Sequence, residues 1–259
     1  MELEGKSAMV CGSTQGIGLS TAILMASRGA KIVLVARNEE KLKTAIMKLD
    51  VSLGQSHEYI VADFSDPESL KSKVQKYVDS SSVDILVNNT GGPKGGAIRE
   101  AEVEEFYAAF TQHLICNHIL VQAVYPKMKA NGFGRIINVI STSVKQPLPN
   151  LGVSNTIRGA VANWSKTLAT ELGPFNITVN NVLPGATNTV RLKSIAETKS
   201  SKTGDSVDTI MESMANMSPM QRIAEPEEVA EAIAFLASDR ASYINGINVP
   251  VDGGRTKSL

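Results

Sequence analysis

Val10-Cys11-Gly12-Ser13-Thr14-Gln15-Gly16-Ile17-Gly18-Leu19 contains three glycines with the spacing G-x-x-x-G-x-G. A short apolar run, 8–10, precedes it and a helix-compatible run, 19–27, follows it, which is typical of a strand, a glycine turn and a helix. Glycine allows positive φ and close approach of a ligand, and the helix N-terminus offers free N–H groups that suit a pyrophosphate. Because the spacing G-x-x-x-G-x-G differs from the commoner G-x-G-x-x-G, an ordinary turn remains the alternative at this point.

Composition limits the classes of protein that need to be considered. The 259 residues suffice for one large α/β domain, and the formal net charge of zero argues against bulk binding to nucleic acid or an anionic membrane. No apolar run approaches the roughly 20 residues of a membrane span, and the acidic start, 1–6, does not resemble a signal peptide. The two cysteines, Cys11 and Cys116, suggest reduced thiols, so we expect a cytoplasmic protein.

Apolar runs suited to buried strands alternate with helical patterns along the whole chain. Such alternation predicts a Rossmann-type, doubly wound parallel sheet of about seven strands in a three-layer αβα arrangement, as a single domain over 1–259. The predicted strands are 8–10, 31–36, 58–62, 83–88, 135–140, 176–183 and 246–251. The predicted helices are 19–27, 38 to about 49, one beginning at Asp66-Pro67, 103–110, 114–129 and 157–172.

Ligands of such sheets bind at the carboxyl ends of the strands, where the second strand ends in Ala36-Arg37. A protein that binds a dinucleotide with a free ribose 2′-hydroxyl usually has an acidic residue at this position, whereas a guanidinium favours a 2′-phosphate. Arg37 therefore favours NADP(H), with NAD(H) as the alternative if Arg37 is only a solvated surface charge. Asp63 and Phe64 would border the adenine, although Asp63 also suits a turn cap.

The order of motifs resembles the short-chain dehydrogenase/reductase family, most closely its bacterial β-ketoacyl-carrier-protein-reductase-like branch. The resemblance covers nearly the whole chain and implies a seven-stranded sheet, a nicotinamide cofactor and usually a homotetramer. We assign no metal site. The motifs are Gly12…Gly16-Ile17-Gly18, Asp63, Asn88-Asn89-Thr90-Gly91, Gly134-Arg135-Ile136-Ile137-Asn138, Ser141, Leu172, Asn180…Pro184-Gly185 and Val251-Asp252-Gly253-Gly254.

The resemblance also implies roles for individual residues. Asn88 would tie the fourth strand to its neighbours, and Cys11 and Thr90 depart from the Thr and Ala that the family often has there. Together with Arg37, Asp63 and Phe64, the cofactor-binding set is Gly12, Ser13, Thr14, Gln15, Gly16, Ile17, Gly18, Asn89, Thr90, Gly91, Arg158, Pro184, Gly185, Thr187 and Thr189.

The catalytic pattern of the family is altered. Its members use Asn, Ser, Tyr and Lys, with Tyr thirteen residues after Ser and Lys four residues after Tyr; here Ser141 is kept, but those spacings lead to Ser154 and Arg158, and His113 stands at the Asn position. A serine hydroxyl is far less acidic than a phenol, and arginine does not titrate in proteins. The usual tyrosine-centred proton transfer is therefore absent, although Arg158 would still hold the nicotinamide ribose.

Two residues are candidate replacement acids. Lys145 lies four residues after Ser141 on an expected pocket wall, and His113 has an ordinary pKa suited to proton transfer. We hypothesise that Ser141 holds the substrate oxygen while Lys145 or His113 supplies the proton. The alternatives are a solvated loop charge for Lys145 and a buried structural histidine for His113.

The region 189–220 corresponds to the family's substrate lid. Met211, Met214 and Met217 recur at three-residue spacing, which predicts an adaptable apolar helix face for an acyl or other apolar substrate, or simply for packing. Three cations of this region would meet an anionic carrier or a carboxylate, or would be surface charges: Arg191, Lys193 and Arg222.

The sequence thus favours an NADP(H)-dependent oxidoreductase that acts on a carbonyl or hydroxyl group, with 3-oxoacyl compounds as candidate substrates. The loss of Tyr and Lys supports an alternative, a catalytically idle or regulatory dinucleotide-binding protein. A third reading is a non-redox reaction, such as dehydration or isomerisation, in the same pocket. The partners that we expect are a small-molecule substrate and further copies of the chain, as a homotetramer or homodimer.

Overall fold

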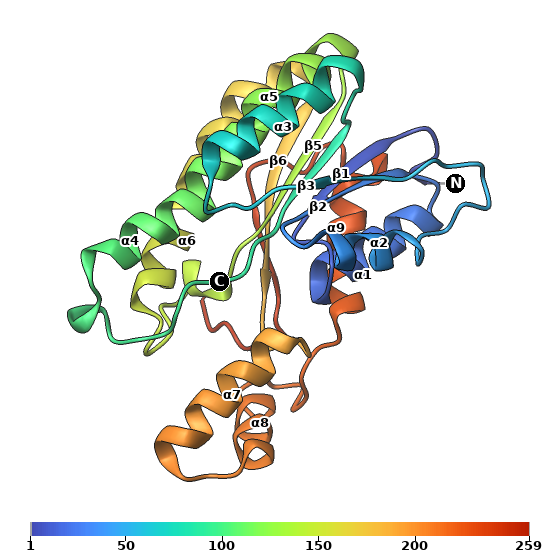
Figure 1. The fold of residues 1–259 in the computed structure, drawn as a ribbon. Coiled ribbons are helices and arrows are strands. Elements are labelled where there is room, and N and C mark those ends of the chain that lie inside the picture. Colours follow the sequence, from blue (N-terminus) through green and yellow to red (C-terminus); the bar gives the residue numbers. More distant parts are fainter. Residues whose placement is uncertain (1, 259) are drawn as a thin grey trace.

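A seven-stranded parallel sheet forms the centre of the computed structural model, which describes residues 2–258 (Figure 1). The strand order β3-β2-β1-β4-β5-β6-β7 reverses direction between β1 and β4, which creates the switch point where ligands of doubly wound sheets bind. The predicted fold class and number of strands are confirmed. The strands are β1 (Ser7–Cys11), β2 (Lys31–Ala36), β3 (Glu58–Val61), β4 (Ile85–Asn88), β5 (Gly134–Val139), β6 (Ile177–Pro184) and β7 (Asn248–Val251).

Helices cover both faces of the sheet. Helices α1 (Gly16–Ser27), α2 (Glu39–Ile46) and α9 (Pro226–Ala237) lie on one face, and α3 (Pro67–Ser80), α5 (Cys116–Asn131) and α6 (Gly152–Leu172) lie on the other, extended by α4 (Val103–Phe110). Short helical turns connect them: η1 (Ile98–Glu100), η2 (Thr111–Ile115), η3 (Thr142–Val144), η4 (Gly173–Phe175) and η5 (Asp239–Ala241). Among the described residues, none of these helices combines the length and apolar character needed to traverse a lipid bilayer.

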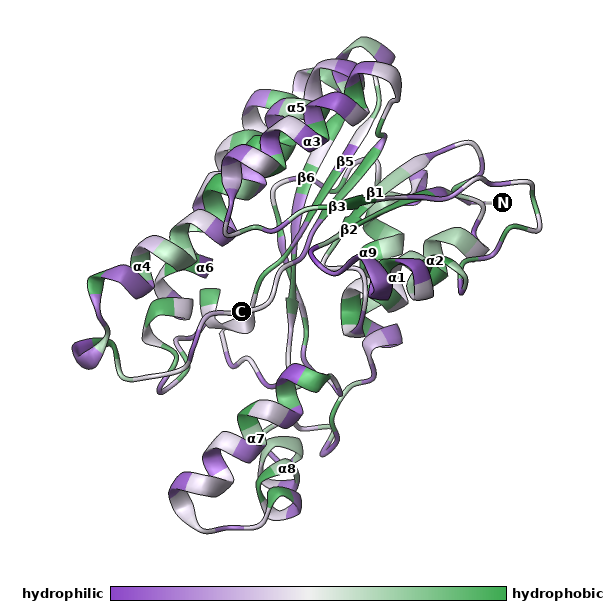
Figure 2. Cartoon of the chain, viewed as in Figure 1, coloured by the Kyte–Doolittle hydropathy of each residue, from purple (hydrophilic) through white to green (hydrophobic). Residues whose placement is uncertain are grey.

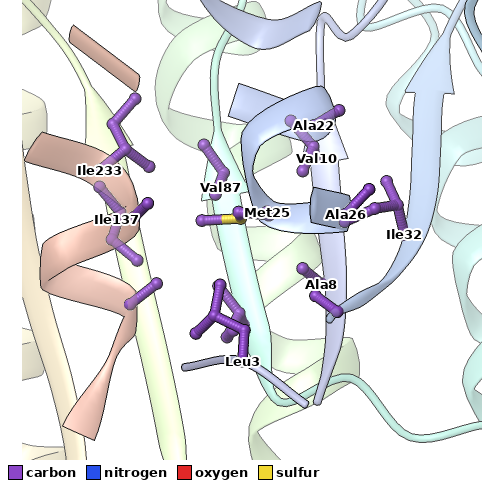
Figure 3. Close-up of a cluster of buried hydrophobic side chains, with 14 of the residues drawn as sticks. Leu3, Ala8, Val10, Ala22, Met25, Ala26, Ile32, Val87, Ile137 and Ile233 are labelled. Carbon is purple, nitrogen blue, oxygen red and sulfur yellow. The ribbon is translucent and has the colours of Figure 1, made fainter. Parts of the chain in front are cut away.

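The core is divided between the two faces because successive strand residues point in opposite directions. In β1, Ala8 and Val10 face the layer of α1 and α9, while Met9 and Cys11 face the layer of α3 and α5. Figure 3 shows Met25 of α1 among apolar side chains from the strands and α9. Figure 2 shows the apolar colour along the strands and the polar colour on outward parts of the helices, as expected for a sheet that is buried on both sides.

Some element boundaries differ from the predicted ones. Helix α6 begins at Gly152, five residues before the predicted start at Ile157. Its first turn is polar, so the apolar pattern conceals it; Thr156 donates a hydrogen bond to the Gly152 carbonyl there. Strand β7 begins at Asn248 instead of 246, since Gly246 has a φ of +70°, which an extended strand does not accommodate.

Helices α7 (Val190–Thr203) and α8 (Val207–Ala215) project away from the sheet layers (Figure 1). The base of this projection is closed by a β-bridge between Thr187 and Ala224. Because α8 ends at Ala215, the predicted three-methionine helix face is wrong: Met217 lies beyond the helix.

Candidate active site

The glycine turn joins β1 to α1 in a conformation that other residues adopt only with strain. Gly12 and Gly16 have φ values of +59° and +53°. A Cβ at Gly12 would lie 2.6 Å from the Asn89 carbonyl oxygen, so this contact also requires glycine. Helix α1 has no side-chain cap and no acidic residue in its first turn. Its free N–H groups are therefore available to an anion such as a pyrophosphate.

A cleft of about 620 Å³ runs along the carboxyl ends of the central strands. It brings together most of the residues that the sequence predicts for cofactor and substrate. Its lining includes Gly12, Thr14, Gln15, Gly16, Ile17, Arg37, Asp63, Phe64, Asn89, Thr90, Gly91, Ser141, Ser154, Arg158, Pro184, Gly185 and Thr189. Residues that the sequence analysis did not assign also line it, among them Gly92, Pro93, Gln112, Leu151, Val190 and Ile195. Gly92 and Pro93 directly follow the predicted motif Asn88-Asn89-Thr90-Gly91 in the sequence.

Three predicted cofactor residues lie outside this lining, and the structure gives a packing role to each. The buried Ser13 Oγ accepts a hydrogen bond of 3.1 Å from the Val35 N–H and so ties the turn to β2. Gly18 allows α1 to approach β1, because a Cβ there would lie 2.3 Å from the Gly12 carbonyl oxygen. Thr187 is buried and donates to the Gly185 carbonyl at 3.3 Å. Direct contact of these three residues with a cofactor is therefore not supported.

One end of the cleft carries Arg37, directly after β2, and Asp63, after β3. The Asp63 carboxylate accepts hydrogen bonds of 2.9 Å from the N–H and the hydroxyl of Ser65. The Ser65 N–H and the nearby charge of Arg37 lower the pKa of Asp63. Asp63 is thus both a turn cap and a cleft residue, and Arg37 is exposed and available to an anion.

The other end is formed by Ser141, Ser154 and Arg158. Ser141 follows β5, and its Oγ accepts a hydrogen bond of 3.1 Å from the Ser143 N–H. Ser154 and Arg158 are four residues apart on α6 and therefore share one helix face, which lines the cleft. The buried Arg158 donates from Nη1 to the Val139 carbonyl oxygen at 3.1 Å. Burial, with a smaller contribution from the charge of Arg191, lowers the pKa of Arg158 to about 10.

His113 lies in the π-helical turn η2, between α4 and α5. Its Nδ1 is 2.6 Å from the Thr90 hydroxyl, and its Nε2 is buried without a partner among the described residues. Burial, and secondly the charge of Arg158, lower the pKa of His113 to about 2. The expectation that His113 titrates in a range suited to proton transfer is therefore wrong, because the buried imidazole is neutral at physiological pH.

Lys145 does not line the cleft. It follows the turn η3, where its N–H donates to the Thr142 carbonyl at 3.0 Å. This turn and the segment 146–149 border a separate cavity of about 270 Å³ together with the C-terminal residues 255–257. The expectation that Lys145 reaches the substrate is therefore not supported by the geometry.

A row of asparagines crosses the sheet beneath the site. The Asn88 amide donates to Asn138 at 2.8 Å, Asn138 donates to Asn181 at 3.1 Å, and Asn181 donates to Asn248 at 2.8 Å. These four residues occupy neighbouring register positions on β4, β5, β6 and β7. The predicted role of Asn88 in tying β4 to its neighbour is confirmed.

The three cations of the predicted lid region differ in their surroundings. Arg191 lines the cleft and donates to the Pro93 carbonyl oxygen at 2.6 Å. Lys193 is exposed and is not part of the lining. Arg222 is paired with Glu228 at 2.6 Å. Of these three, only Arg191 is placed to meet a molecule in the cleft.

Three comparisons with known proteins all find reductases. The family model described as enoyl-(acyl carrier protein) reductase matches residues 12–256. NADPH-dependent reductase BacG of Bacillus subtilis is 32% identical over 98% of this chain and 99% of its own, and 3-oxoacyl-[acyl-carrier-protein] reductase FabG of Vibrio cholerae is 33% identical over 98% of each chain. The crystal structure of L-sorbose reductase from Gluconobacter frateurii, complexed with NADPH and L-sorbose, has a TM-score of 0.93 and 35% identity over 100% of both chains.

The chain belongs to the short-chain dehydrogenase/reductase family. The family that the motifs predicted is thus confirmed. BacG is NADPH-dependent and L-sorbose reductase is seen with NADPH, in agreement with the cofactor that Arg37 favours.

Proposed function

We propose that this protein is an NADP(H)-dependent oxidoreductase that interconverts a carbonyl and a hydroxyl group. One observation carries the proposal: a single cleft joins the glycine turn and Arg37 at one end to Ser141, Ser154 and Arg158 at the other. Two reductases add support: L-sorbose reductase shares the fold over 100% of this chain, and BacG aligns with 98% of it.

The residues of the cleft fit NADP(H). The N-terminus of α1 lacks a side-chain cap and acidic residues, which leaves its N–H groups for the pyrophosphate. Arg37 would bind the 2′-phosphate, and Pro184, Gly185 and Thr189 would lie along the nicotinamide. When bound, the cofactor would supply or accept the hydride.

The substrate chemistry would rely on hydroxyl groups instead of a phenol. Ser141 and Ser154 line the same end of the cleft from two different elements, and each has an O–H that can donate to the substrate oxygen. Two such donors would stabilise the negative charge that develops on that oxygen. Since His113 is buried and neutral and Lys145 lies outside the cleft, we infer that the proton comes from water. Arg158 would hold the nicotinamide ribose.

Substitution of the two serines tests this proposal. Ser141→Ala and Ser154→Ala should each lower kcat for NADPH-dependent carbonyl reduction by about 10²-fold and leave the Kd for NADPH unchanged. Ser143→Ala is the matched control, because the Ser143 hydroxyl is buried and outside the cleft lining. Unchanged turnover in both site variants would contradict the proposed roles.

A catalytically idle or regulatory dinucleotide-binding protein is the second candidate. One observation favours it: none of the described residues that line the cleft is a tyrosine, lysine or histidine. Tight NADPH binding without oxidation across a broad panel of ketones, aldehydes and 3-oxoacyl thioesters would support this candidate over the oxidoreductase.

The assembly and the lid are further parts of the proposal. We propose that the whole chain acts as one domain, with α7 and α8 as a substrate lid.

We also propose that the chain forms a homotetramer or homodimer. The apolar side chains of Tyr107, Phe110 and Ile115, on α4 and the turn after it, are exposed and suit an interface between copies of the chain. Light scattering coupled to size-exclusion chromatography would give the mass; a monomeric mass would contradict the predicted assembly.

A further inference from the structure

Arg158 carries a buried positive charge that no carboxylate of the described chain balances. Arg158 is 7% exposed, and its one hydrogen-bond partner among the described residues is the Val139 carbonyl oxygen. No ion pair within residues 2–258 includes it. A guanidinium has five N–H donors in a planar fork, and among the described residues only Nη1 has a hydrogen-bond partner. Burying a charge in this way is costly unless a partner of opposite charge is present.

A second guanidinium adds to the positive charge of the same region. Arg191, at the start of α7, also lines the cleft, and its one hydrogen bond goes to the neutral Pro93 carbonyl. It lies near enough to lower the pKa of Arg158 further. The only carboxylate of the lining is Asp63, which lies beside Arg37 and accepts the Ser65 hydrogen bonds. Of the three cations in the lining, Arg158 and Arg191 therefore have no ion-pair partner among the described residues.

The proposed cofactor does not account for both charges. Its phosphates would lie at the glycine turn and at Arg37, and the ribose hydroxyls that Arg158 would contact are neutral. We propose that the substrate is an oxo acid: its carbonyl oxygen is held by Ser141 and Ser154, and its carboxylate is bound by Arg158 and Arg191. This inference rests on the proposed function and adds the chemical class of the substrate.

The carboxylate takes no part in bond making. A hydride adds to the carbonyl carbon to form the C–H bond, the C=O electron pair moves onto oxygen, and that oxygen takes a proton from water. The hydride, with its two electrons, would be supplied by NADPH, so that the oxo acid would become a hydroxy acid. The two arginines would thus orient the substrate, since guanidinium forks match carboxylates in geometry as well as charge.

Binding to the protein saturated with NADP⁺ tests the inference without turnover. Pyruvate, 4-oxopentanoate and cyclohexanecarboxylate would each be titrated by calorimetry beside the matching amide. At least one carboxylate should bind about 10- to 100-fold more tightly than its amide, as expected for a charge-assisted pair. Arg191→Leu and Arg158→Met should each remove most of this preference. Lys193→Leu is the matched control and should retain it, because Lys193 lies two residues from Arg191 but outside the cleft lining.

The inference would be overturned by equal binding of every acid and its amide, by no binding of any of them, or by a preference that survives in both arginine variants. If Arg191→Leu binds NADP⁺ more weakly but still prefers acids to amides, Arg191 binds the cofactor phosphates, and that result would also overturn the inference.

NADPH oxidation separates this inference from the proposed function. Faster reduction of 4-oxopentanamide than of 4-oxopentanoate would leave the function standing and contradict the oxo acid, whereas selective carboxylate binding with no reduction of any oxo compound would contradict the function.

Discussion

Replacing Arg158 with methionine should make the ligand-free protein more stable. The guanidinium is buried, and its pKa is lowered from 12.5 to about 10, which corresponds to about 3 kcal/mol against the charged form in the folded state. Arginine is protonated at pH 7 in both folded and unfolded states, so this full cost is present there. Methionine fills a similar volume without charge, while loss of the bond to the Val139 carbonyl costs about 1–2 kcal/mol. The net gain is about 1–2 kcal/mol, or a Tm higher by about 2–8 °C for a chain of this size.

Differential scanning calorimetry of the ligand-free protein measures this change directly. Arg99→Met is the control, because the Arg99 side chain is 81% exposed and its ion pair within residues 2–258 is with the exposed Glu100, so the Tm of this variant should change little. A lower Tm for Arg158→Met than for the parent would show that the protein itself compensates the charge. That result would refute the reasoning that the site holds an unbalanced cation for a ligand.

Three further predictions concern the cofactor end, the histidine and the asparagine row. Arg37→Leu should weaken NADPH binding about 10- to 100-fold and leave NADH binding nearly unchanged in fluorescence titrations; an equal loss for both cofactors would contradict the 2′-phosphate role. Because His113 has a folded pKa of about 2, far below its unfolded value, the unfolded chain binds the extra proton as the pH falls through 6.5. Urea denaturation should therefore show that the parent loses about 2 kcal/mol more stability than His113→Asn between pH 7 and pH 5; equal losses would place a charged histidine in the fold. Asn138→Leu should lower the free energy of unfolding by about 2–4 kcal/mol, since it removes the acceptor of the Asn88 amide and one of the two donors to the Asn181 oxygen, which keeps its bond from the Ser165 hydroxyl; a change below about 1 kcal/mol would contradict a structural role for the row.

The fold could be predicted from local signals because the sheet is parallel and buried on both faces. Near-continuous apolar runs such as 31–36 and 135–140 mark the strands, and Asp66-Pro67 marks the start of α3 through an N-cap that accepts from the Ser69 N–H. The boundaries at 152 and 248 were less predictable. The polar first turn of α6 and the positive φ of Gly246 do not change the apolar pattern from which the boundaries were predicted.

The candidate site was predictable only where a residue's role depends on its place at a strand end or on one helix face. Ser141, Ser154 and Arg158 fall into this class, because the four-residue spacing on α6 places the last two on the same face. The buried His113 has its Nδ1 beside the hydroxyl of Thr90, 23 residues earlier in the chain, and no local pattern encodes that contact. Lys145 is close to Ser141 in sequence, but the intervening turn η3 directs the chain to a different cavity.

NADPH oxidation by the purified protein, with product analysis, on a panel of oxo acids and uncharged ketones tests directly whether this chain is an oxidoreductase. We predict that NADPH binds more tightly than NADH and that its oxidation matches the formation of the corresponding hydroxy compound one for one. Binding of NADPH with no oxidation on any member of the panel would contradict an oxidoreductase and support the idle or regulatory protein.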